Sequence, residues 1–478
     1  MCGGAPSVRH RKTEWFCDST SGALGFCLCE RRPVFRRRLS RTLGFGTCLA
    51  DCSGMTNDQT STPSSSSSPG TASHRSIGID AIAFAVPRAY VELADLAAAR
   101  GVPPTKYIQG LGVVQMAVAH PDEDPVTLAT EAARRCLMAA GRSPAEIGLC
   151  IVGTETAVDH SKPVSSYLHG LLGLPSACRV FETKHACFGG TAGLLNAVDW
   201  LAAGSARGRC ALIVCTDIAR YSVGTAGEPT QGAGAVAMLI SENPRLLELE
   251  PGITGCFSQN VHDFWRPLYR KDALVDGQFS VQCYLDALAG AYAEWQRLSE
   301  SSEPLVRTCY HVPYGKMARK AHQRRCQLDG MTDEAADKSF AVEVEPSLRV
   351  PSQVGNIYTG SLYLALLSLL YHQAAELSGK RIGLFSYGSG CAAEFFAGRV
   401  MPTAAAQIAR AGVDTTLANR HRLDIPVYEE LRKNDIHVDQ RPSEMPSAAE
   451  TGAALAMVDR SPRFNGIDNQ ERRIYTVA

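Results

Sequence analysis

The sequence predicts an α/β protein, because short apolar runs alternate along the chain with longer segments of helical periodicity. Ile147 to Val152 and Cys210 to Cys215 are apolar runs of the length and composition expected for strands buried on both faces of a sheet. Pro125 to Ala140 and Ser361 to Leu377 have the length and apolar spacing of core helices. Strands that alternate with helices in this way indicate a sheet covered by helices.

Composition excludes several classes of protein. The chain has 478 residues, enough for two or more ordinary domains or for one large duplicated unit. Lys plus Arg and Asp plus Glu number 48 each, a balance that argues against a general nucleic-acid surface. No run of 18 uninterrupted apolar residues occurs, so we expect no membrane-spanning segment.

The cysteines indicate a reducing environment. Of the 17 cysteines, 11 are scattered from Cys136 to Cys391 without metal-ligand spacing. An odd number without a pattern is better explained by reduced, buried thiols than by disulfides, which favours the cytoplasm and predicts no metal site.

The first 75 residues are predicted to lie outside the fold. Residues 1–54 combine six cysteines with an arginine cluster, and a serine-rich polar leader follows Met55. Such a leader cannot build a core, so residues 1–75 are interpreted as a disordered leader or a misassigned start. A chain that begins at Met55 is expected to be fully active.

Ordered structure is expected from Ile77 onward. Ile77 to Pro87 is typical of a strand ended by proline, and Leu93 to Arg100 of a helix. The strand Ile147 to Val152 places Glu155 just beyond its carboxyl end, where ligands bind in open α/β sheets. Near the other end of the chain, the strand Ile382 to Tyr387 runs directly into the tight turn Gly388 to Gly390.

Cys187 is predicted to lie on a sharp turn between a strand and a helix. Ala177 to Glu182 is typical of an extended segment, and Thr191 to Ala203 has an apolar helical face. Backbone amides at the start of a helix favour a thiolate, so we expect a lowered pKa for Cys187 and a site for a thioester oxyanion. Gly189 and Gly190 suit a turn that approaches a ligand closely. The alternative is a cysteine that serves only as a small buried apolar residue.

Three segments resemble one family. Glu182 to Leu194 resembles the active-site cysteine segment of the hydroxymethylglutaryl-CoA synthases, which belong to the thiolase superfamily. Val152 to Pro163 is similar to the catalytic glutamate segment of that family, and Tyr310 to Met317 to its catalytic histidine segment. The resemblance covers about residues 76 to 460 and implies a thiolase-like duplicated αβαβα layered fold.

The resemblance also implies a division of the chain. An N-terminal half, residues 76–245, would carry Glu155 and Cys187, and a C-terminal half, residues 246–478, would carry His311. A polar tail is expected after about residue 460.

The same resemblance implies an enzyme with three catalytic residues. Cys187 would hold an acetyl group as a thioester, and Glu155 would remove a proton from its methyl group. His311 would polarise the ketone of a 3-oxoacyl thioester, and water would then release a 3-hydroxy-3-methylglutaryl-type product. Taken singly, Glu155 could be a solvated carboxylate and His311 a structural histidine, so the weight lies in the combination.

Four further residues are candidates for substrate binding. Asn356 and Ser389 resemble positions that orient substrate in the family, although either could simply cap or turn the backbone. Lys316 and Lys320 could meet the phosphates of a pantetheine-bearing substrate, although most surface lysines are only solvated.

The family includes two branches that differ in the acceptor. Polyketide β-branching synthases use a 3-oxoacyl chain on an acyl carrier protein, and mevalonate-pathway synthases use acetoacetyl-CoA. Ala186 to Ala192 and Tyr387 to Phe396 look more like the β-branching branch, whereas Val312 and Lys316 look more like the mevalonate branch. The prediction is therefore a β-branching synthase, with the mevalonate enzyme as the alternative. Its substrates would be pantetheine thioesters, with no tightly bound cofactor and a homodimeric assembly.

Two other classes are disfavoured. A non-catalytic scaffold that binds acyl carriers would not need Cys187, Glu155 and His311 together. A decarboxylating ketosynthase would normally place two histidines near its cysteine, whereas a glutamate occupies the base position here.

Overall fold

The computed structural model describes residues 75–270, 272–433 and 461–476. Of the predicted leader, residues 1–75, all but Arg75 lie outside the described residues, Met55 among them. The described residues belong to one compact unit.

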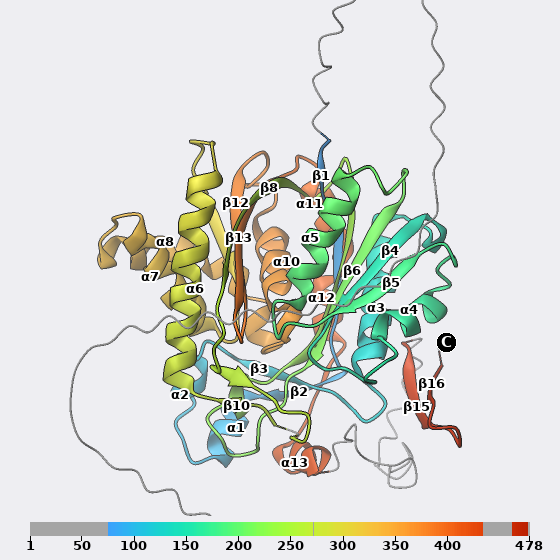
Figure 1. The fold of residues 1–478 in the computed structure, drawn as a ribbon. Helices are drawn as coiled ribbons and strands as arrows, with labels where there is room; N and C mark the ends of the chain where they lie inside the picture. The colour runs from blue at the N-terminus through green and yellow to red at the C-terminus, as the bar shows by residue number, and fades with distance from the viewer. Residues whose placement is uncertain (1–74, 271, 434–460, 477–478) are drawn as a thin grey trace, which may run out of the picture. The chain divides into compact units, whose positions relative to one another are not determined.

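A nine-stranded sheet forms the centre of this unit (Figure 1). In sheet order its strands are β11 (Arg307–Tyr310), β12 (Arg381–Gly388), β13 (Ala392–Val400), β8 (Leu247–Ser258), β1 (Ile77–Ala85), β7 (Ala233–Glu242), β6 (Cys210–Ile218), β4 (Ile147–Gly153) and β5 (Arg179–Thr183).

The two ends of this sheet repeat one arrangement of strands. In the order β4-β6-β7-β1 the first pairing is parallel and the next two are antiparallel. The order β11-β12-β13-β8 has the same sequence of pairings. The two sets meet where β1 and β8 pair antiparallel. The repeated topology agrees with the duplicated thiolase-like fold, and the division at residues 245 and 246 stays a prediction.

Helices form the other layers. They are α1 (Leu93–Ala99), α2 (Thr105–Ile108), α3 (Pro125–Ala140), α4 (Val164–Leu172), α5 (Gly189–Ala202), α6 (Gly277–Leu298), α7 (Gly315–Leu328), α8 (Asp333–Glu343), α9 (Glu345–Leu348), α10 (Ser361–Gln373), α11 (Ala404–Ile408), α12 (Val413–Ala418) and α13 (Ile425–Lys433).

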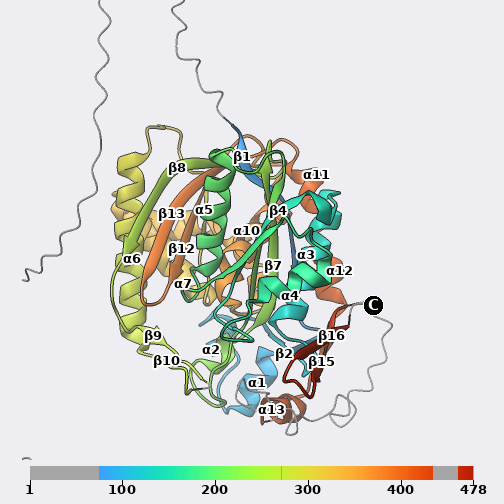
Figure 2. The same cartoon turned by 45° about the vertical axis from the view of Figure 1, so that its right-hand side comes forward.

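Contacts between elements define five layers. The helix α3 packs on one face of β1, β7 and β6, while α5 packs on the other face of β4 and β6. In the second strand set, α10 contacts β11 and β12, and α6 packs on β8 and β13. Figure 2 shows α6 and α3 on opposite sides, with α5 and α10 between them. Each of the two strand sets supplies one β layer, so the layers are αβαβα.

Strands of the first set are buried on both faces, as their composition predicts. In β4, Leu149 and Ile151 join the apolar cluster that contains α5, whereas Cys150 and Val152 join the cluster that contains α3. Successive side chains of a strand point to opposite faces of the sheet. When both faces are covered by apolar layers, the sequence of the strand is therefore one continuous apolar run.

Small sheets and short turns complete the unit. A three-stranded sheet contains β14 (His421–Arg422), β2 (Ala89–Glu92) and β3 (Gln115–Val118), and two-stranded sheets join β9 (Phe264–Trp265) to β10 (Leu274–Val275) and β15 (Arg463–Ile467) to β16 (Arg473–Thr476). The 3₁₀ turns include η2 (Glu228–Thr230) and η4 (Tyr358–Gly360).

Most predicted elements are confirmed to within a few residues. The predicted helix Pro125 to Ala140 is α3, and the predicted strand Ile382 to Tyr387 lies within β12. The helix predicted from Ser361 to Leu377 ends earlier, at Gln373. The tail after about residue 460 forms the hairpin of β15 and β16, which Arg473 ties to Asp124 at 2.8 Å.

The described cysteines are free thiols, and all of them except Cys187 and Cys256 are buried. Within the same residues, no group of three or more His, Cys, Asp or Glu side chains is arranged to hold a metal ion. Of the helices that the structure describes, none is both long and apolar enough to cross a membrane.

We expect Gly190→Ala to destabilise the protein by about 1–3 kcal/mol, because overpacking at a close contact forces its neighbours to move. A Cβ on Gly190 would lie 2.4 Å from the Cys215 sulfur and 2.9 Å from the Thr359 carbonyl oxygen. Gly170→Ala in α4 is the control, since nothing lies within 4 Å of its Cβ position. Urea unfolding should show a lower midpoint for Gly190→Ala alone, and equal midpoints for both variants would contradict the expectation.

Candidate functional site

Cys187 lies in the turn between β5 and α5, where the sequence predicts it. Ala186 has a φ of 40°, in the left-handed region that costs a residue with a side chain about 1–2 kcal/mol. The N–H of Phe188 donates to the His185 carbonyl at 2.9 Å, which closes the turn. The N–H of Gly189 donates to the Ala186 carbonyl at 3.3 Å. These two N–H groups already donate to carbonyls within the turn. They are therefore not the donors that we expected for a thioester oxyanion.

The turn Gly388 to Gly390 packs directly against the cysteine turn. A Cβ on Gly388 would lie 2.5 Å from the His185 carbonyl oxygen and 2.6 Å from the Phe188 nitrogen, so only glycine permits this approach. The imidazole of His185 hydrogen-bonds the backbone carbonyl of Ser389. Ser389 is thereby placed beside the cysteine turn, where it is partly exposed.

Asp263, to which the sequence alone gives no chemical role, holds the Gly388 to Gly390 turn from the other side. Its carboxylate is fully buried and accepts hydrogen bonds from the Tyr387 hydroxyl at 2.6 Å and from the Gly390 N–H at 3.0 Å. Buried carboxylates require such donors, because an unpaired one would lose its hydration without compensation.

Glu155 and Cys187 are in contact. The thiol of Cys187 donates to Glu155 Oε1 over 3.3 Å, and both side chains are partly exposed. Burial and then the nearby Asp217 carboxylate raise the pKa of Glu155 to about 8. Burial and then the Glu155 carboxylate raise the pKa of Cys187 well above its usual value. The expectation of a lowered pKa at Cys187 is therefore wrong, because desolvation and a neighbouring anion outweigh the start of the helix.

Asp217, at the end of β6, fixes the segment that carries Glu155. Its Oδ1 atom accepts from the backbone N–H of Glu155 at 2.9 Å and from the hydroxyls of Thr154 and Thr156 at 3.0 and 2.8 Å. Its Oδ2 atom accepts from the N–H and hydroxyl of Thr359 at 3.1 and 2.5 Å. The sequence analysis missed Asp217, although it lies at the carboxyl end of a buried strand, as Glu155 does.

His311 follows β11 and is buried, with 2% of its surface exposed. The backbone N–H of His311 donates to the Phe385 carbonyl at 2.8 Å. The backbone carbonyl of His311 accepts from the Tyr284 hydroxyl, also at 2.8 Å. Burial lowers the pKa of His311 to about 3, so the imidazole is neutral near pH 7. A neutral imidazole carries one N–H, which can donate to a substrate oxygen.

Asn356 belongs to a second group of polar side chains beside Cys187. Its Oδ1 atom accepts from the Tyr358 N–H at 2.9 Å and from the Ser361 hydroxyl at 2.8 Å. Asn356 and Tyr358 also hydrogen-bond the phenol of Tyr221, which sequence reasoning missed. Burial and the nearby Cys187 raise the pKa of Tyr221 above its usual value.

A cavity of about 350 Å³ reaches Glu155 and Ala186. Lys184, Arg220 and Arg266 are among the residues that line it, and Arg266 also donates to the Glu155 carbonyl. The predicted phosphate-binding residues Lys316 and Lys320 lie elsewhere, on α7 just after His311, and among the described residues neither lines this cavity.

Two family models match this chain. The model for the N-terminal part of hydroxymethylglutaryl-coenzyme A synthase matches residues 73–244. The model for the C-terminal part matches residues 247–339 and 326–478.

Individual proteins are similar over most of their length. The hydroxymethylglutaryl-CoA synthase of Enterococcus faecalis is 39% identical over 364 residues, which are 76% of this chain and 93% of that protein. The polyketide biosynthesis 3-hydroxy-3-methylglutaryl-ACP synthase PksG of Bacillus subtilis is 34% identical over 373 residues, 75% of this chain and 88% of PksG. The solved structure of MvaS in complex with 3-hydroxy-3-methylglutaryl coenzyme A has a TM-score of 0.76 and 46% identity, and it covers 84% of this chain and 99% of MvaS.

Glu155→Gln should increase the rate at which iodoacetamide alkylates Cys187 at pH 8 several-fold. The substitution removes the negative charge that, after burial, contributes most to the raised pKa of the thiol. Glu182→Gln is the matched control, because Glu182 accepts the Val164 N–H on the other side of β5. Mass spectrometry of the Cys187 peptide separates it from other thiols, and a rate that falls in Glu155→Gln would contradict the assigned electrostatics.

Proposed function

Because this chain belongs to the hydroxymethylglutaryl-CoA synthase family of acyl-condensing enzymes, we propose that Cys187, Glu155 and His311 join an acetyl group to the ketone of a 3-oxoacyl thioester. The contact of 3.3 Å between the Cys187 thiol and Glu155 is the observation that carries these assignments. It brings together a group able to hold the acetyl and a base beside that acetyl.

Loading begins at the Cys187 sulfur. The sulfur attacks the carbonyl of a donor acetyl thioester, the new C–S bond forms, and the pantetheine thiol leaves with a proton. Since the Glu155 carboxylate raises the pKa of the thiol, loading does not require that carboxylate. The cysteine turn holds the acetyl methyl group towards Glu155.

Condensation then uses the other two residues. Glu155, with a pKa of about 8, can accept and return protons near neutral pH, so it removes a proton from the acetyl methyl group. The resulting enolate carbon attacks the ketone of the acceptor, and the neutral imidazole of His311 donates to the developing alkoxide. Water finally cleaves the bond to Cys187 and releases the product.

Supporting roles follow from position. Ser389 lies on the turn that packs against the cysteine turn, Asn356 hydrogen-bonds Tyr221, and both orient the acyl chain in this proposal. Lys316 and Lys320 lie on the helix after His311, where they would meet phosphates of a pantetheine-bearing substrate. As a homodimer, the protein could pair through β5, which has β4 as its one neighbour among the described strands of the sheet.

Cys187→Ala should lose all label from a radiolabelled acetyl thioester, whereas Glu155→Ala should retain the label and lose condensation by about 10²-fold or more. The division follows because Glu155 acts only after the acetyl group is in place. Peptide mapping and product assays on folded variants measure the two steps separately. Label on another cysteine, or equal loss of label in both variants, would overturn the assignment.

CoA is the acceptor carrier that overall similarity favours. By sequence, identity is 39% with the Enterococcus synthase against 34% with PksG, whose name specifies an ACP-bound product. Among solved structures, it is 46% with MvaS against 31% with PksG. The segments Ala186 to Ala192 and Tyr387 to Phe396 favour the carrier-protein acceptor, which is the second candidate. Both carriers end in the same pantetheine arm, so the three catalytic residues do not distinguish them.

We expect kcat/KM for acetoacetyl-CoA to exceed that for acetoacetyl carrier protein by about tenfold, a difference of about 1.4 kcal/mol in transition-state binding. Acetoacetyl-pantetheine, which lacks both the nucleotide and the protein, is the reference substrate. Lys316→Gln with Lys320→Gln should reduce the advantage of CoA over that reference. A carrier protein used better than CoA would instead establish the β-branching function.

A further inference from the structure

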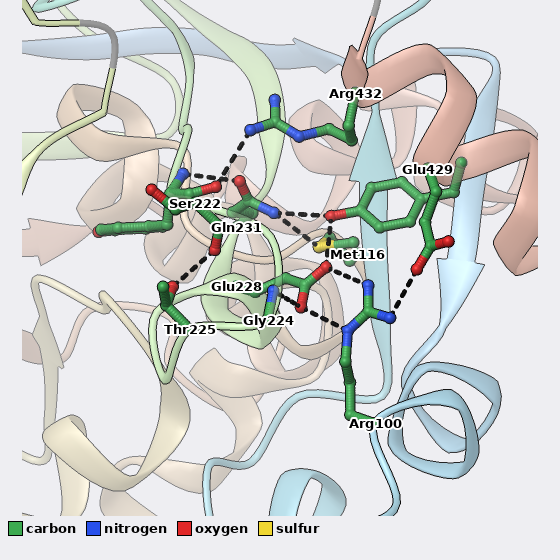
Figure 3. A network of polar contacts seen from close by, with 11 residues as sticks. Arg100, Met116, Ser222, Gly224, Thr225, Glu228, Gln231, Glu429 and Arg432 are labelled. Atoms are coloured by element: carbon green, nitrogen blue, oxygen red, sulfur yellow. Dashed lines mark hydrogen bonds and ion pairs between the residues drawn. The ribbon is translucent and has the colours of Figure 1, made fainter.

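The loop between β6 and β7 carries Tyr221 and is held by a buried polar network (Figure 3). Glu228, in η2, is the centre of this network and has only 1% of its surface exposed. The network joins three parts of the chain that are far apart in sequence: the end of α1, the loop itself and α13. The burial of a charged side chain that anchors a surface loop needs a physical explanation.

Glu228 accepts hydrogen bonds from all three parts. Arg100, just after α1, donates to both carboxylate oxygens at 2.8 Å. The Gly224 N–H donates at 2.8 Å from within the loop, and the Tyr428 hydroxyl donates at 3.1 Å from α13. Arg100 also donates to the carboxylate of Glu429, on α13, at 2.6 Å.

The network then reaches Tyr221 through Gln231. The Nε2 atom of Gln231 donates to the Tyr428 hydroxyl at 3.1 Å, and its Oε1 atom accepts the Tyr221 N–H at 2.7 Å. The carbonyl of Tyr221 accepts from Arg432 at 3.1 Å. Both backbone groups of Tyr221 are therefore fixed by contacts that lead to α13.

The electrostatics agree with an ionised centre. The pKa of Glu228 is lowered although burial opposes its charge, because the hydrogen bonds from Arg100 and Gly224 outweigh that burial. A charged, multiply hydrogen-bonded group has one preferred geometry, unlike an apolar contact that can slide.

The other end of Tyr221 lies at the candidate site. Its phenol hydrogen-bonds with Asn356 and Tyr358, and its ring packs edge-on against Phe264 with centroids 6.2 Å apart. Phe264 lines the cavity that reaches Glu155. Tyr221 therefore links the network to the reacting groups. Its backbone is anchored by α13, and its phenol lies beside Cys187.

We propose that the network of Arg100, Glu228, Tyr428 and Gln231 is a positioning device that sets the phenol of Tyr221 against Cys187 and Glu155 for condensation. The inference rests on the proposed function and extends it to residues remote from the reacting atoms. Catalytic geometry tolerates little displacement, since a shift of about 1 Å can cost about 10²-fold in rate. Acetyl loading depends on Cys187 itself and is affected much less.

Tyr428→Phe tests the proposal, because it removes the hydroxyl between Gln231 and Glu228 and keeps the ring. We expect kcat for condensation to fall about tenfold, with KM and Cys187 acetylation within about twofold of the wild type. Tyr292→Phe is the matched control, because Tyr292 is also buried and its hydroxyl donates to Asp329 at 2.9 Å, away from the site. Tyr292→Phe should lose about as much stability as Tyr428→Phe, without any loss of activity.

A double-mutant cycle separates positioning from stability. If Tyr428 acts through Tyr221, adding Tyr428→Phe to Tyr221→Phe should lower kcat by less than about twofold further. Multiplicative losses, equal losses in Tyr292→Phe, or unchanged kcat in Tyr428→Phe would each overturn the proposal. Arg100→Lys, which keeps the charge and loses the paired hydrogen bonds, should show the same pattern and serves if Tyr428→Phe unfolds. Wild-type enzyme that neither acetylates nor condenses would refute the proposed function instead.

Discussion

The carboxylate of Asp217 ties together three of the chain segments from which the site is built. It lies at the end of β6 and accepts five hydrogen bonds from the Glu155 segment after β4 and from Thr359 before α10. A buried carboxylate without these donors would be strongly unfavourable, so each donor is fixed in place by the need to solvate the charge. The position of Glu155 therefore depends on an anion that does not contact Cys187 through any described hydrogen bond.

Burial, and then the neighbouring carboxylates, set the proton affinities at the site. Two carboxylates and a thiol share a poorly solvated region, and burial together with their mutual repulsion raises the pKa of both Glu155 and Cys187. His311 experiences burial without a compensating anion, and its pKa falls to about 3. Glu155 is consequently the group that can exchange protons near neutral pH, while His311 remains a neutral hydrogen-bond donor.

Positioning extends outward from these groups in successive contacts. Asp263 secures the turn that carries Ser389, and Gly388 allows that turn to touch the cysteine turn without a side chain between them. In the same way, Glu228 secures the loop of Tyr221. In each case a buried carboxylate bound to backbone N–H groups fixes a loop, which gives irregular segments the rigidity that a site on regular elements would have.

The sequence by itself determined the strands, the helices and the identity of the principal groups. Apolar runs such as Cys210 to Cys215, the helical period of Pro125 to Ala140 and the glycines after Cys187 are local signals, and each reports the burial or turn that it specifies. Tertiary structure alone decided what those groups meet. Nothing local to Cys187 indicates that Glu155 lies 3.3 Å away and raises its pKa, and nothing near Tyr221 indicates Tyr428, about two hundred positions later. Desolvation and charge coupling depend on distances between segments remote in sequence, and folding of the whole chain sets those distances.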